Sequence, residues 1–429
     1  MAYLISFFLF SIGFYLHHRR KTWVAPDVLY CYEWGFITFL ASLRLFSLYS
    51  AGIETWMIIL IGSIAYLIGV GTSDKIAIKS HENKNLTIYQ DSFMKNRLFW
   101  IFTNIFYFIG FIGLFRVIRM LFTTSITLDQ IRLASYGIIE LDGYAYQGGG
   151  ILDIVKVFLT AIKTILIATG VQIFLTNISK NTKYIIAVTG LVIIESFTDG
   201  GRFGLAYLMI EIYVGFSFYS RYLLNTRRIF SLKAKRLIQT IIILLLMVII
   251  IITILRGASF NELAKKYYRY LCGNIIYLDR RVKILDSGQF YSFTFAGLYG
   301  FWSIFLPIIV NLFGISYPSL YLSTIERVMD TQTYYMIGQN MTTNAFVTPF
   351  YHLYADFRWI GIIFGMFCFG LIVGIAFKRA KICKSRHDII LYLIIAQMIF
   401  KTLHAYPLVN PSYVVILIIF YLNNKRIKI

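Results

Sequence analysis

Long apolar stretches separated by short polar segments recur along the whole chain and constrain its fold more than any other feature. Most are close to the roughly 20 residues that an α-helix needs to cross the hydrocarbon core of a bilayer. Eleven are present, at residues 2–16, 28–48, 55–72, 98–122, 151–175, 184–199, 203–220, 237–255, 359–377, 388–402 and 411–423. Only 14% of the residues are charged, whereas soluble domains usually carry about a quarter. The sequence therefore excludes a water-soluble enzyme and predicts an all-α polytopic membrane protein with about 11–12 transmembrane helices.

The uneven distribution of Lys and Arg between the connecting segments predicts the orientation. More than half of the 41 lie in alternate segments, at 17–26, 73–97, 176–183, 221–236, 378–387 and from 424 onward. Since short cytoplasmic loops carry the excess of positive charge, the N-terminus is predicted outside and the C-terminus in the cytoplasm. We explain the net charge of +21 by these cytoplasmic loops, which face anionic lipid, and not by binding to nucleic acid. The first apolar stretch is predicted to be a span and not a removed signal peptide, because HHRRK follows it.

One large loop, residues 256–358, is predicted on the extracytoplasmic side of a single integral membrane domain of residues 1–429. Its segment 291–315 is apolar enough to span, yet a crossing there would place the basic run at 378–386 outside. We therefore expect this segment to dip into the membrane or to lie at its surface. A twelfth span is the alternative.

Basic residues also lie within or at the ends of the predicted spans, where each costs a few kcal/mol unless it faces a cavity or a partner. Those on the predicted outer side come from several separate helices: Arg44, Arg116, Arg119, Arg202, Arg256, Arg358, Lys401 and His404. Snorkelling to the headgroups explains any single one of them. For the group we favour a shared anionic ligand, a lipid-linked phosphate or pyrophosphate, because guanidinium groups bind phosphoryl oxygens bidentately.

Two short motifs on the predicted outer side supply candidate anion contacts. TDGGR at 198–202 is a tight turn whose glycines permit close approach of a ligand, and Arg202 then starts the next helix. LRG at 255–257 places Arg256 at the end of a span. A plain hairpin turn with a snorkelling arginine is the alternative interpretation.

The stretch 265–281 mixes cations with tyrosines, including Arg269 and Tyr270, a composition suited to contacts with phosphate and sugar rings. A solvated interfacial helix is an equally good account of it. The four cysteines of the chain have no metal-ligand spacing, so we expect neither a metal site nor a cofactor.

The segment that leads into the ninth span contains a candidate base. His352 and Asp356 are four residues apart and share one face if this segment is helical. A histidine that is oriented by a carboxylate is a competent general base near neutral pH. Two unpartnered polar residues at a membrane surface would have the same sequence.

The chain resembles bacterial oligosaccharide repeat-unit polymerases, the O-antigen and capsule polymerases of the Wzy type. The likeness lies in PDVLYCYEWGFITFLASLRLFSLYS at 26–50, in the following span that ends YLIGVGT, in the GGR turn, in the LRG segment before the large loop, and in NAFVT followed by LYADF. It covers nearly the whole chain.

This resemblance implies a glycosyltransferase-C-like multi-span fold, related to O-antigen ligases and without a required metal. It implies that the growing glycan is transferred from undecaprenyl pyrophosphate to the next lipid-linked repeat unit, on the outer face of a bacterial cytoplasmic membrane. The substrate-contacting residues that it implies are Arg202, Arg256, Asn344, Tyr354 and Asp356. The family often has Gly after Asp-Phe, where this chain has Arg358.

The residues and the resemblance together predict a metal-independent glycosyltransferase. Stabilisation of the departing pyrophosphate is assigned to Arg202, Arg256, Arg116, Arg119 and Arg358. Removal of the proton from the acceptor hydroxyl is assigned to Asp356 or His352. The expected partners are undecaprenyl-pyrophosphate-linked oligosaccharides, membrane lipid and a chain-length regulator protein, but no nucleic acid. An O-antigen ligase and a flippase or transporter of lipid-linked oligosaccharide are the alternatives, and the in-span charges Lys156, Lys163 and Glu211 support the transporter.

Overall fold

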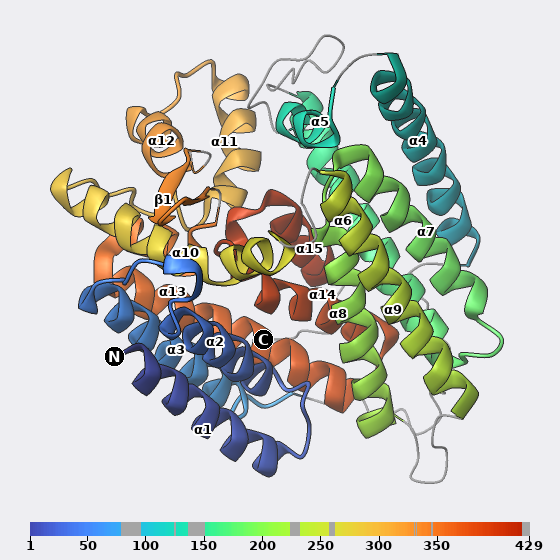
Figure 1. Ribbon diagram of the computed structural model, residues 1–429. Helices are drawn as coiled ribbons and strands as arrows, with labels where there is room; N and C mark the ends of the chain where they lie inside the picture. The colour runs from blue at the N-terminus through green and yellow to red at the C-terminus, as the bar shows by residue number, and fades with distance from the viewer. Residues whose placement is uncertain are drawn as a thin grey trace. The chain divides into compact units, whose positions relative to one another are not determined.

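The protein is almost entirely helical in the computed structural model, which describes residues 1–78, 96–123, 126–135, 151–223, 232–256, 262–329, 331, 333–344 and 346–422 (Figure 1). Its longer helices are α1 (Ala2–Arg20), α2 (Pro26–Ser42), α3 (Ile53–Ser73), α4 (Asn96–Thr123), α6 (Ile151–Thr176), α7 (Thr182–Asp199), α8 (Phe203–Phe218), α9 (Leu232–Leu255), α10 (Leu263–Ser287), α11 (Tyr299–Phe313), α13 (Thr348–Cys383), α14 (Arg386–Lys401) and α15 (Pro411–Leu422). The shorter elements are α5 (Leu128–Ser135), α12 (Ser319–Thr324), and the antiparallel strands β1 (Tyr335–Gly338) and β2 (Met341–Thr343). These two strands form the only sheet in the described residues, so the predicted all-α class is confirmed.

Each predicted span falls on a helix, as expected when a chain must satisfy its backbone hydrogen bonds inside an apolar medium. The span predicted at 28–48 is too long, because α2 ends at Ser42. Within the described ranges, six helices are long and apolar enough to cross a membrane: α3, α4, α6, α8 with its continuation to Leu223, α9 and α13. The other five predicted spans are helices that are shorter or less apolar. A membrane protein is therefore supported, whereas the number of 11–12 crossings stays a prediction. The loop charges that predict the orientation lie partly outside the described residues, at 79–95, 224–231 and 423–429.

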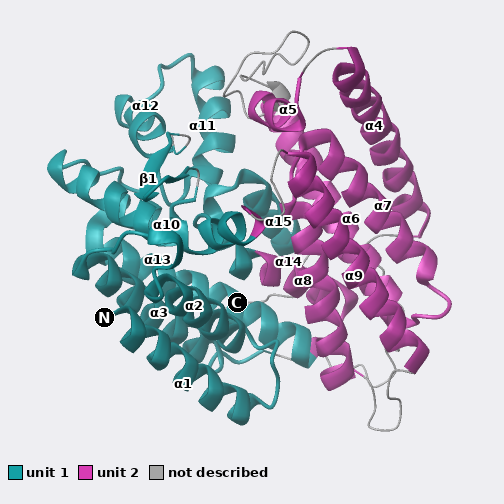
Figure 2. Ribbon diagram, viewed as in Figure 1, with its two compact units in different colours: residues 1–80, 264–382, 398–429 teal, residues 81–263, 383–397 magenta. Residues whose placement is uncertain are grey.

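The chain divides into two compact units (Figure 2). Unit 1 comprises Met1–Ser80, Ala264–Ile382 and Met398–Ile429, and unit 2 comprises His81–Leu263 and Cys383–Gln397. The prediction of one integral membrane domain stays a prediction, and each unit is described by itself below.

Helices α3 and α13 of unit 1 pack closely through glycine. A Cβ atom on Gly69 would lie 2.2 Å from the carbonyl oxygen of Phe367, and one on Gly370 would lie 2.2 Å from that of Tyr66. Small residues at such contacts let helix backbones approach, which is a common mode of association between membrane helices. The absence of side chains at these two positions is therefore what allows the core of unit 1 to close.

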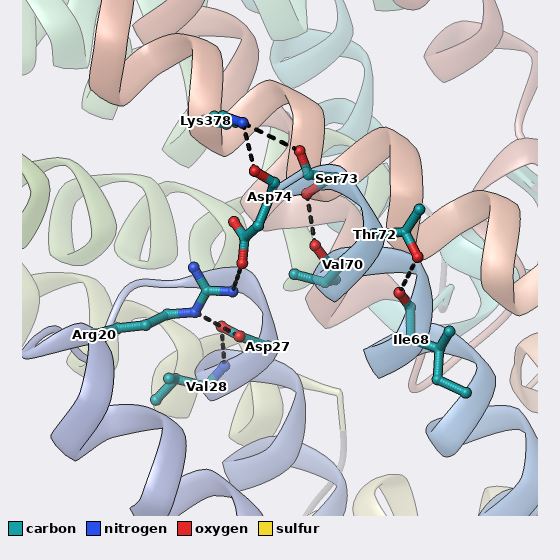
Figure 3. Close-up of polar contacts among 9 residues, drawn as sticks. All are labelled: Arg20, Asp27, Val28, Ile68, Val70, Thr72, Ser73, Asp74 and Lys378. Carbon is teal, nitrogen blue, oxygen red and sulfur yellow. Dashed lines mark hydrogen bonds and ion pairs between the residues drawn. The ribbon is translucent and has the colours of Figure 1, made fainter. Parts of the chain in front are cut away.

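Polar contacts tie four helices of unit 1 together at one end (Figure 3). The guanidinium of Arg20, at the end of α1, donates to Asp27 at 2.6 Å and to Asp74 at 2.9 Å. Lys378 of α13 donates to the backbone carbonyls of Asp74 and Ile76 at 2.7 and 2.6 Å, which the end of α3 would otherwise leave without partners. Three segments that the charge pattern predicts to be cytoplasmic thus meet at this end.

Three segments that are predicted to be outside also meet in unit 1. Asp279 of α10 accepts a hydrogen bond from the backbone N–H of Gly52 at 2.7 Å. The amide of Asn274, also on α10, donates to the carbonyl of Leu403 at 2.7 Å. In unit 1, these contacts join segments that the charges predict on the same side, and the orientation of both groups stays a prediction.

The large predicted loop, 256–358, is mostly helical where it is described. Its segment 291–315 begins with turns and continues as α11, which has 15 residues and contains Pro307. At 1.5 Å per residue α11 is about 22 Å long, less than the roughly 30 Å of a hydrocarbon core. Helix α15, a predicted span, is shorter still, with 12 residues, so both the membrane-dipping element and the twelfth span stay predictions.

In unit 2, α7 packs against α4, α6 and α8. Polar side chains pair inside this bundle: Gln397 donates to Glu211 at 2.7 Å, and Gln172 donates to the hydroxyl of Tyr219 at 2.9 Å. All four are buried. Burying such groups in an apolar bundle is expensive unless they find partners. These contacts satisfy one oxygen of Glu211 and the amide nitrogen of Gln172, whereas the buried Glu211 Oε2 and Gln172 Oε1 accept no hydrogen bond within the described residues.

Candidate functional site

The two motifs of unit 2 meet through Arg256. Its guanidinium donates to the carboxylate of Asp129 at 2.6 and 3.0 Å and to the carbonyl of Gly200 at 3.4 Å. Gly200 ends α7 with φ +62°, the left-handed conformation that glycine adopts without strain. Arg202 donates to the hydroxyl of Thr253 at 2.6 Å. The turn at 198–202 and the end of α9 are therefore joined, but the charge of Arg256 is already compensated by an acid.

The other unit 2 cations lie apart from these motifs along the sequence. Arg116 and Arg119 are exposed side chains of α4. Lys163 of α6 forms an ion pair with Glu195 of α7, and Lys156 pairs with Asp153 at 3.5 Å. For Arg116 and Arg119, both snorkelling to headgroups and ligand binding remain compatible with their exposure.

In unit 1, a break in α13 places Arg358 beside three other polar side chains. Phe357 and Arg358 leave helical geometry, with φ values of −143° and +52°, so the helix changes direction there. The guanidinium of Arg358 donates to the carbonyl of Leu285 at 2.9 Å and lies 3.4 Å from Asp286. It also lies over the rings of Tyr291 and Tyr354, at 4.6 and 5.0 Å from their centroids.

Tyr354 completes this arrangement, which we name the Asp286 cluster (Glu54, Asp286, Tyr291, Tyr354 and Arg358). Its hydroxyl lies 3.0 Å from Asp286 and 3.2 Å from Glu54. The side chain of Asp286 is 38% exposed, so a substrate hydroxyl can reach it. Sequence reasoning identified Tyr354 and Arg358 but missed both carboxylates, since no short-range pattern joins residue 54 to residue 286.

Asp356 lies inside unit 1 and organises a loop. Its carboxylate accepts hydrogen bonds from the hydroxyl of Ser292 at 2.6 Å and from the backbone N–H groups of Ala296 and Gly297 at 3.1 and 2.8 Å. His352, one helical turn away, is 2% exposed. The carboxylate that was predicted to orient His352 is thus engaged with the loop, and the assignment of either residue as the base stays a prediction.

The remaining predicted residues of unit 1 belong to a second group, which we name the Lys401 cluster: Arg269, Tyr270, Phe346, Lys401, His404 and Tyr413. Arg269 lies over the ring of Tyr270, 5.4 Å from its centroid. The Tyr270 ring packs on Phe346 at 5.7 Å, and the Phe346 ring packs on His404 at 4.4 Å in a tilted arrangement. Lys401 lies over the ring of Tyr413 at 4.8 Å.

The segment before α13 holds the Lys401 cluster in place. The backbone N–H of Val347 donates to the carbonyl of His404 at 2.9 Å, and Asn344 lies in the same segment, three residues earlier. Burial and the neighbouring charge of Lys401 lower the pKa of His404 to about 3, so its imidazole is neutral at physiological pH. The cations of the cluster are therefore Arg269 and Lys401.

The Lys401 cluster differs from the arginine sites in charge compensation. Among the residues that the structure describes, neither Arg269 nor Lys401 forms an ion pair. Lys401 is partly buried and is the last residue of α14, where the helix dipole is negative. Arg256 and Arg358, in contrast, each have a carboxylate. A cation without an acidic partner in an apolar setting is the better receptor for an external anion.

Asp279 fixes the position of α10, and its ionisation makes the stability of unit 1 depend on pH. Its side chain is 7% exposed. Although burial alone would raise the pKa of Asp279, hydrogen bonds from Lys283, the Gly52 N–H and Thr55 hold it below its usual value. Because the folded pKa is lowered, the stabilisation is complete above the unfolded pKa near 3.9 and is lost as the pH falls through the folded value.

We therefore expect Asp279→Asn to lower the free energy of unfolding by about 1.5–3 kcal/mol at pH 7, the contribution of hydrogen bonds to a charged group. The difference from the unmodified protein should shrink below pH 4, as measured by thermal unfolding in detergent micelles. Asp153→Asn is the control, since its exposed ion pair should contribute less than about 1 kcal/mol. A difference for Asp279→Asn that does not change with pH would contradict this account.

The predicted site residues are divided between the units: Arg116, Arg119, Arg202 and Arg256 belong to unit 2, and Arg269, Tyr270, Asn344, His352, Tyr354, Asp356 and Arg358 belong to unit 1. Their convergence on one cavity stays a prediction. No protein-family model, curated protein or solved structure matches this chain.

Proposed function

We propose that this protein polymerises lipid-linked oligosaccharide repeat units of O-antigen or capsule on the outer face of a bacterial cytoplasmic membrane. The growing glycan is transferred from undecaprenyl pyrophosphate to the next lipid-linked unit. The observation that carries this proposal is the Lys401 cluster, in which cations without acidic partners lie among aromatic rings at the end of an apolar helix. The resemblance to repeat-unit polymerases supplies the reaction.

The chemistry of the donor explains why such cations are needed. When the bond between C1 of the donor sugar and the phosphate breaks, negative charge develops on the departing pyrophosphate. Lys401 and Arg269 stabilise that charge, since preorganised cations are worth most in a site of low dielectric constant. The rings of Tyr270, Phe346 and Tyr413 exclude water around the diphosphate.

The acceptor is assigned to the Asp286 cluster. Asp286 is a partly exposed carboxylate that shares the hydroxyl of Tyr354 with Glu54. It accepts a hydrogen bond from a hydroxyl of the acceptor glycan, and Arg358 orients the carboxylate. Because Asp286 is 17 residues from Arg269 on α10, about 25 Å at 1.5 Å per residue, it positions the acceptor chain and does not take the proton of the attacking hydroxyl. Asp356, which was predicted as the base, acts in this proposal through the loop at 292–297 that it holds.

A flippase or transporter is the second candidate, and the buried polar pairs of unit 2 favour it. Glu211 and Gln397 form one pair and Gln172 and Tyr219 the other, and polar groups inside a helical bundle often mark a transport path. The polymerase proposal also includes the glycosyltransferase-C-like multi-span fold, the location in the cytoplasmic membrane and a chain-length regulator protein as partner.

Gel analysis of surface glycan from a deletion strain separates the candidates. Loss of a polymerase leaves a single repeat unit attached to the lipid core, loss of a ligase leaves long chains on the carrier, and loss of a flippase leaves the units inside the cell. We expect the first pattern. The unmodified gene should restore the ladder, which is the series of gel bands from glycan chains of increasing length. Asp286→Asn should slow polymer formation by about tenfold, because the variant loses one charge-assisted hydrogen bond to the acceptor glycan. A normal ladder from the deletion strain would overturn the proposal.

A further inference from the structure

A pocket of about 420 Å³ lies in unit 1 between α10 and β1, which are neighbours in Figure 1. Its lining residues are Arg280, Lys283, Ile284, Ser287, Tyr335 and Met336. Pockets for small ligands commonly have volumes of roughly 300–1,000 Å³, so this one is large enough for a sugar residue. It shares no residue with the Lys401 cluster or the Asp286 cluster.

The helix residues of the pocket form one exposed stripe. They are spaced i, i+3, i+4 and i+7, which places them on one face of α10. All four are exposed, whereas the neighbouring Arg281 is buried. On the opposite wall, the ring of Tyr335 packs on that of Tyr277 with 5.2 Å between the centroids. Both walls thus belong to regular elements that hold their side chains in place.

The pocket carries one positive charge that the protein does not compensate. The ammonium of Lys283 lies 2.6 Å from the carboxylate of Asp279, which pairs its charge. Arg280 forms no hydrogen bond or ion pair with any residue in the described part of the chain. Its planar guanidinium is available for two parallel hydrogen bonds to a carboxylate.

Apolar surface surrounds this charge. Ile284 is 46% exposed and Met336 is 47% exposed, and Tyr335 adds an aromatic ring. Such a wall fits the C–H face of a pyranose ring, which gains by leaving water. We propose that this pocket binds an acidic sugar residue of the glycan, a uronic acid whose carboxylate pairs with Arg280. The assignment of this sugar to the polymerase substrate rests on the proposed function, whereas the binding itself does not.

Isothermal titration of the full-length protein in detergent micelles tests the site. The probes are digalacturonic acid, the neutral disaccharide cellobiose and inorganic phosphate. We expect digalacturonic acid to bind at least tenfold more tightly than either comparator, because only it offers both a carboxylate and a sugar face. Equal binding of cellobiose would overturn the role of charge, and equal binding of phosphate would show a plain anion site and overturn the role of sugar.

Two exposed substitutions locate the binding. Arg280→Gln should weaken the affinity for digalacturonic acid by about tenfold or more, the loss expected for one charge-assisted hydrogen bond. Met336→Glu should weaken it by a similar factor through repulsion of the carboxylate. Arg19→Gln, an exposed arginine outside the pocket, is the matched control and should bind like the unmodified protein. Unfolding temperatures of the three variants show that each one folds, and unchanged affinity in folded Arg280→Gln would overturn the proposal.

The outcomes separate this inference from the proposed function. If the protein binds digalacturonic acid through Arg280 but the deletion strain makes glycan of normal length, the acidic-sugar pocket is supported and the polymerase function is overturned. If the deletion strain makes only single repeat units but the protein does not prefer the acidic disaccharide, the polymerase function is supported and the acidic-sugar pocket is overturned.

Discussion

Lys401→Met should reduce the rate of glycan polymerisation by about a hundredfold to a thousandfold, the loss seen when one preorganised group that stabilises developing charge is removed. Methionine keeps the length and the apolar stem of lysine, so packing on the Tyr413 ring is largely preserved while the charge is lost. The measurement is the appearance of polymer from lipid-linked repeat units in membrane vesicles. In cells, the surface glycan should shift from long chains to single units.

Charge, and not side-chain shape, should decide this result. Lys401→Arg keeps the cation and should recover most of the rate, although a guanidinium fits the space differently. Lys75→Met, at an exposed lysine after α3, removes the same charge elsewhere in unit 1 and should leave the ladder unchanged. If Lys401→Met made polymer at the normal rate while present at the normal level in the membrane, the Lys401 cluster would not be the diphosphate site.

Gly69→Leu should prevent unit 1 from closing. The added Cβ would lie 2.2 Å from the carbonyl oxygen of Phe367 and 2.9 Å from the N–H of Leu371, so the obstacle is helix backbone and no rotamer relieves it. Core overpacking usually costs about 1–3 kcal/mol, and an obstruction by backbone should exceed that range because α3 and α13 must move apart. We expect little folded protein in the membrane, measured by size-exclusion chromatography of detergent extracts.

The same helix provides a matched control two residues later. A Cβ on Gly71 has nothing within 4 Å. Gly71→Leu therefore makes the same change in composition and in helix propensity without the obstruction, and this variant should accumulate and elute like the unmodified protein. Equal behaviour of the two variants would contradict the close packing of α3 on α13.

The pairing of arginines with acids in both units shows why identifying arginines was not sufficient to locate a site. Arg256 and Arg358 have the residue type that binds phosphate best, yet each is already paired with an acid. Lys401 was grouped with the outer-side cations, but the stabilisation of the pyrophosphate was not assigned to it. Its importance depends on what surrounds it, and the aromatic rings around it come from residues 270, 346, 404 and 413.

Local patterns predicted the helices well because each one depends on its own residues. A stretch such as 237–255 is apolar throughout, and in a membrane only a helix satisfies its backbone, so α9 follows without reference to any other part of the chain. Three segments of unit 1 with the same predicted side also meet at one end, through Arg20, Asp74 and Lys378, while the orientation itself stays a prediction. The break in α13 was not predicted, because neither Phe357 nor Arg358 is a helix-breaking residue such as proline or glycine.

The sequence by itself determined that this protein is all-α, apolar enough for a membrane, and rich in cations at the ends of its helices. Only the tertiary structure decided which of those cations are compensated. The partner of Arg256 lies 127 residues away, and the loop that Asp356 anchors begins 64 residues before it. Helix formation is a property of neighbours along the chain, whereas charge pairing depends on distances that close only when distant segments pack, and the electrostatic character of each site is therefore set by the fold.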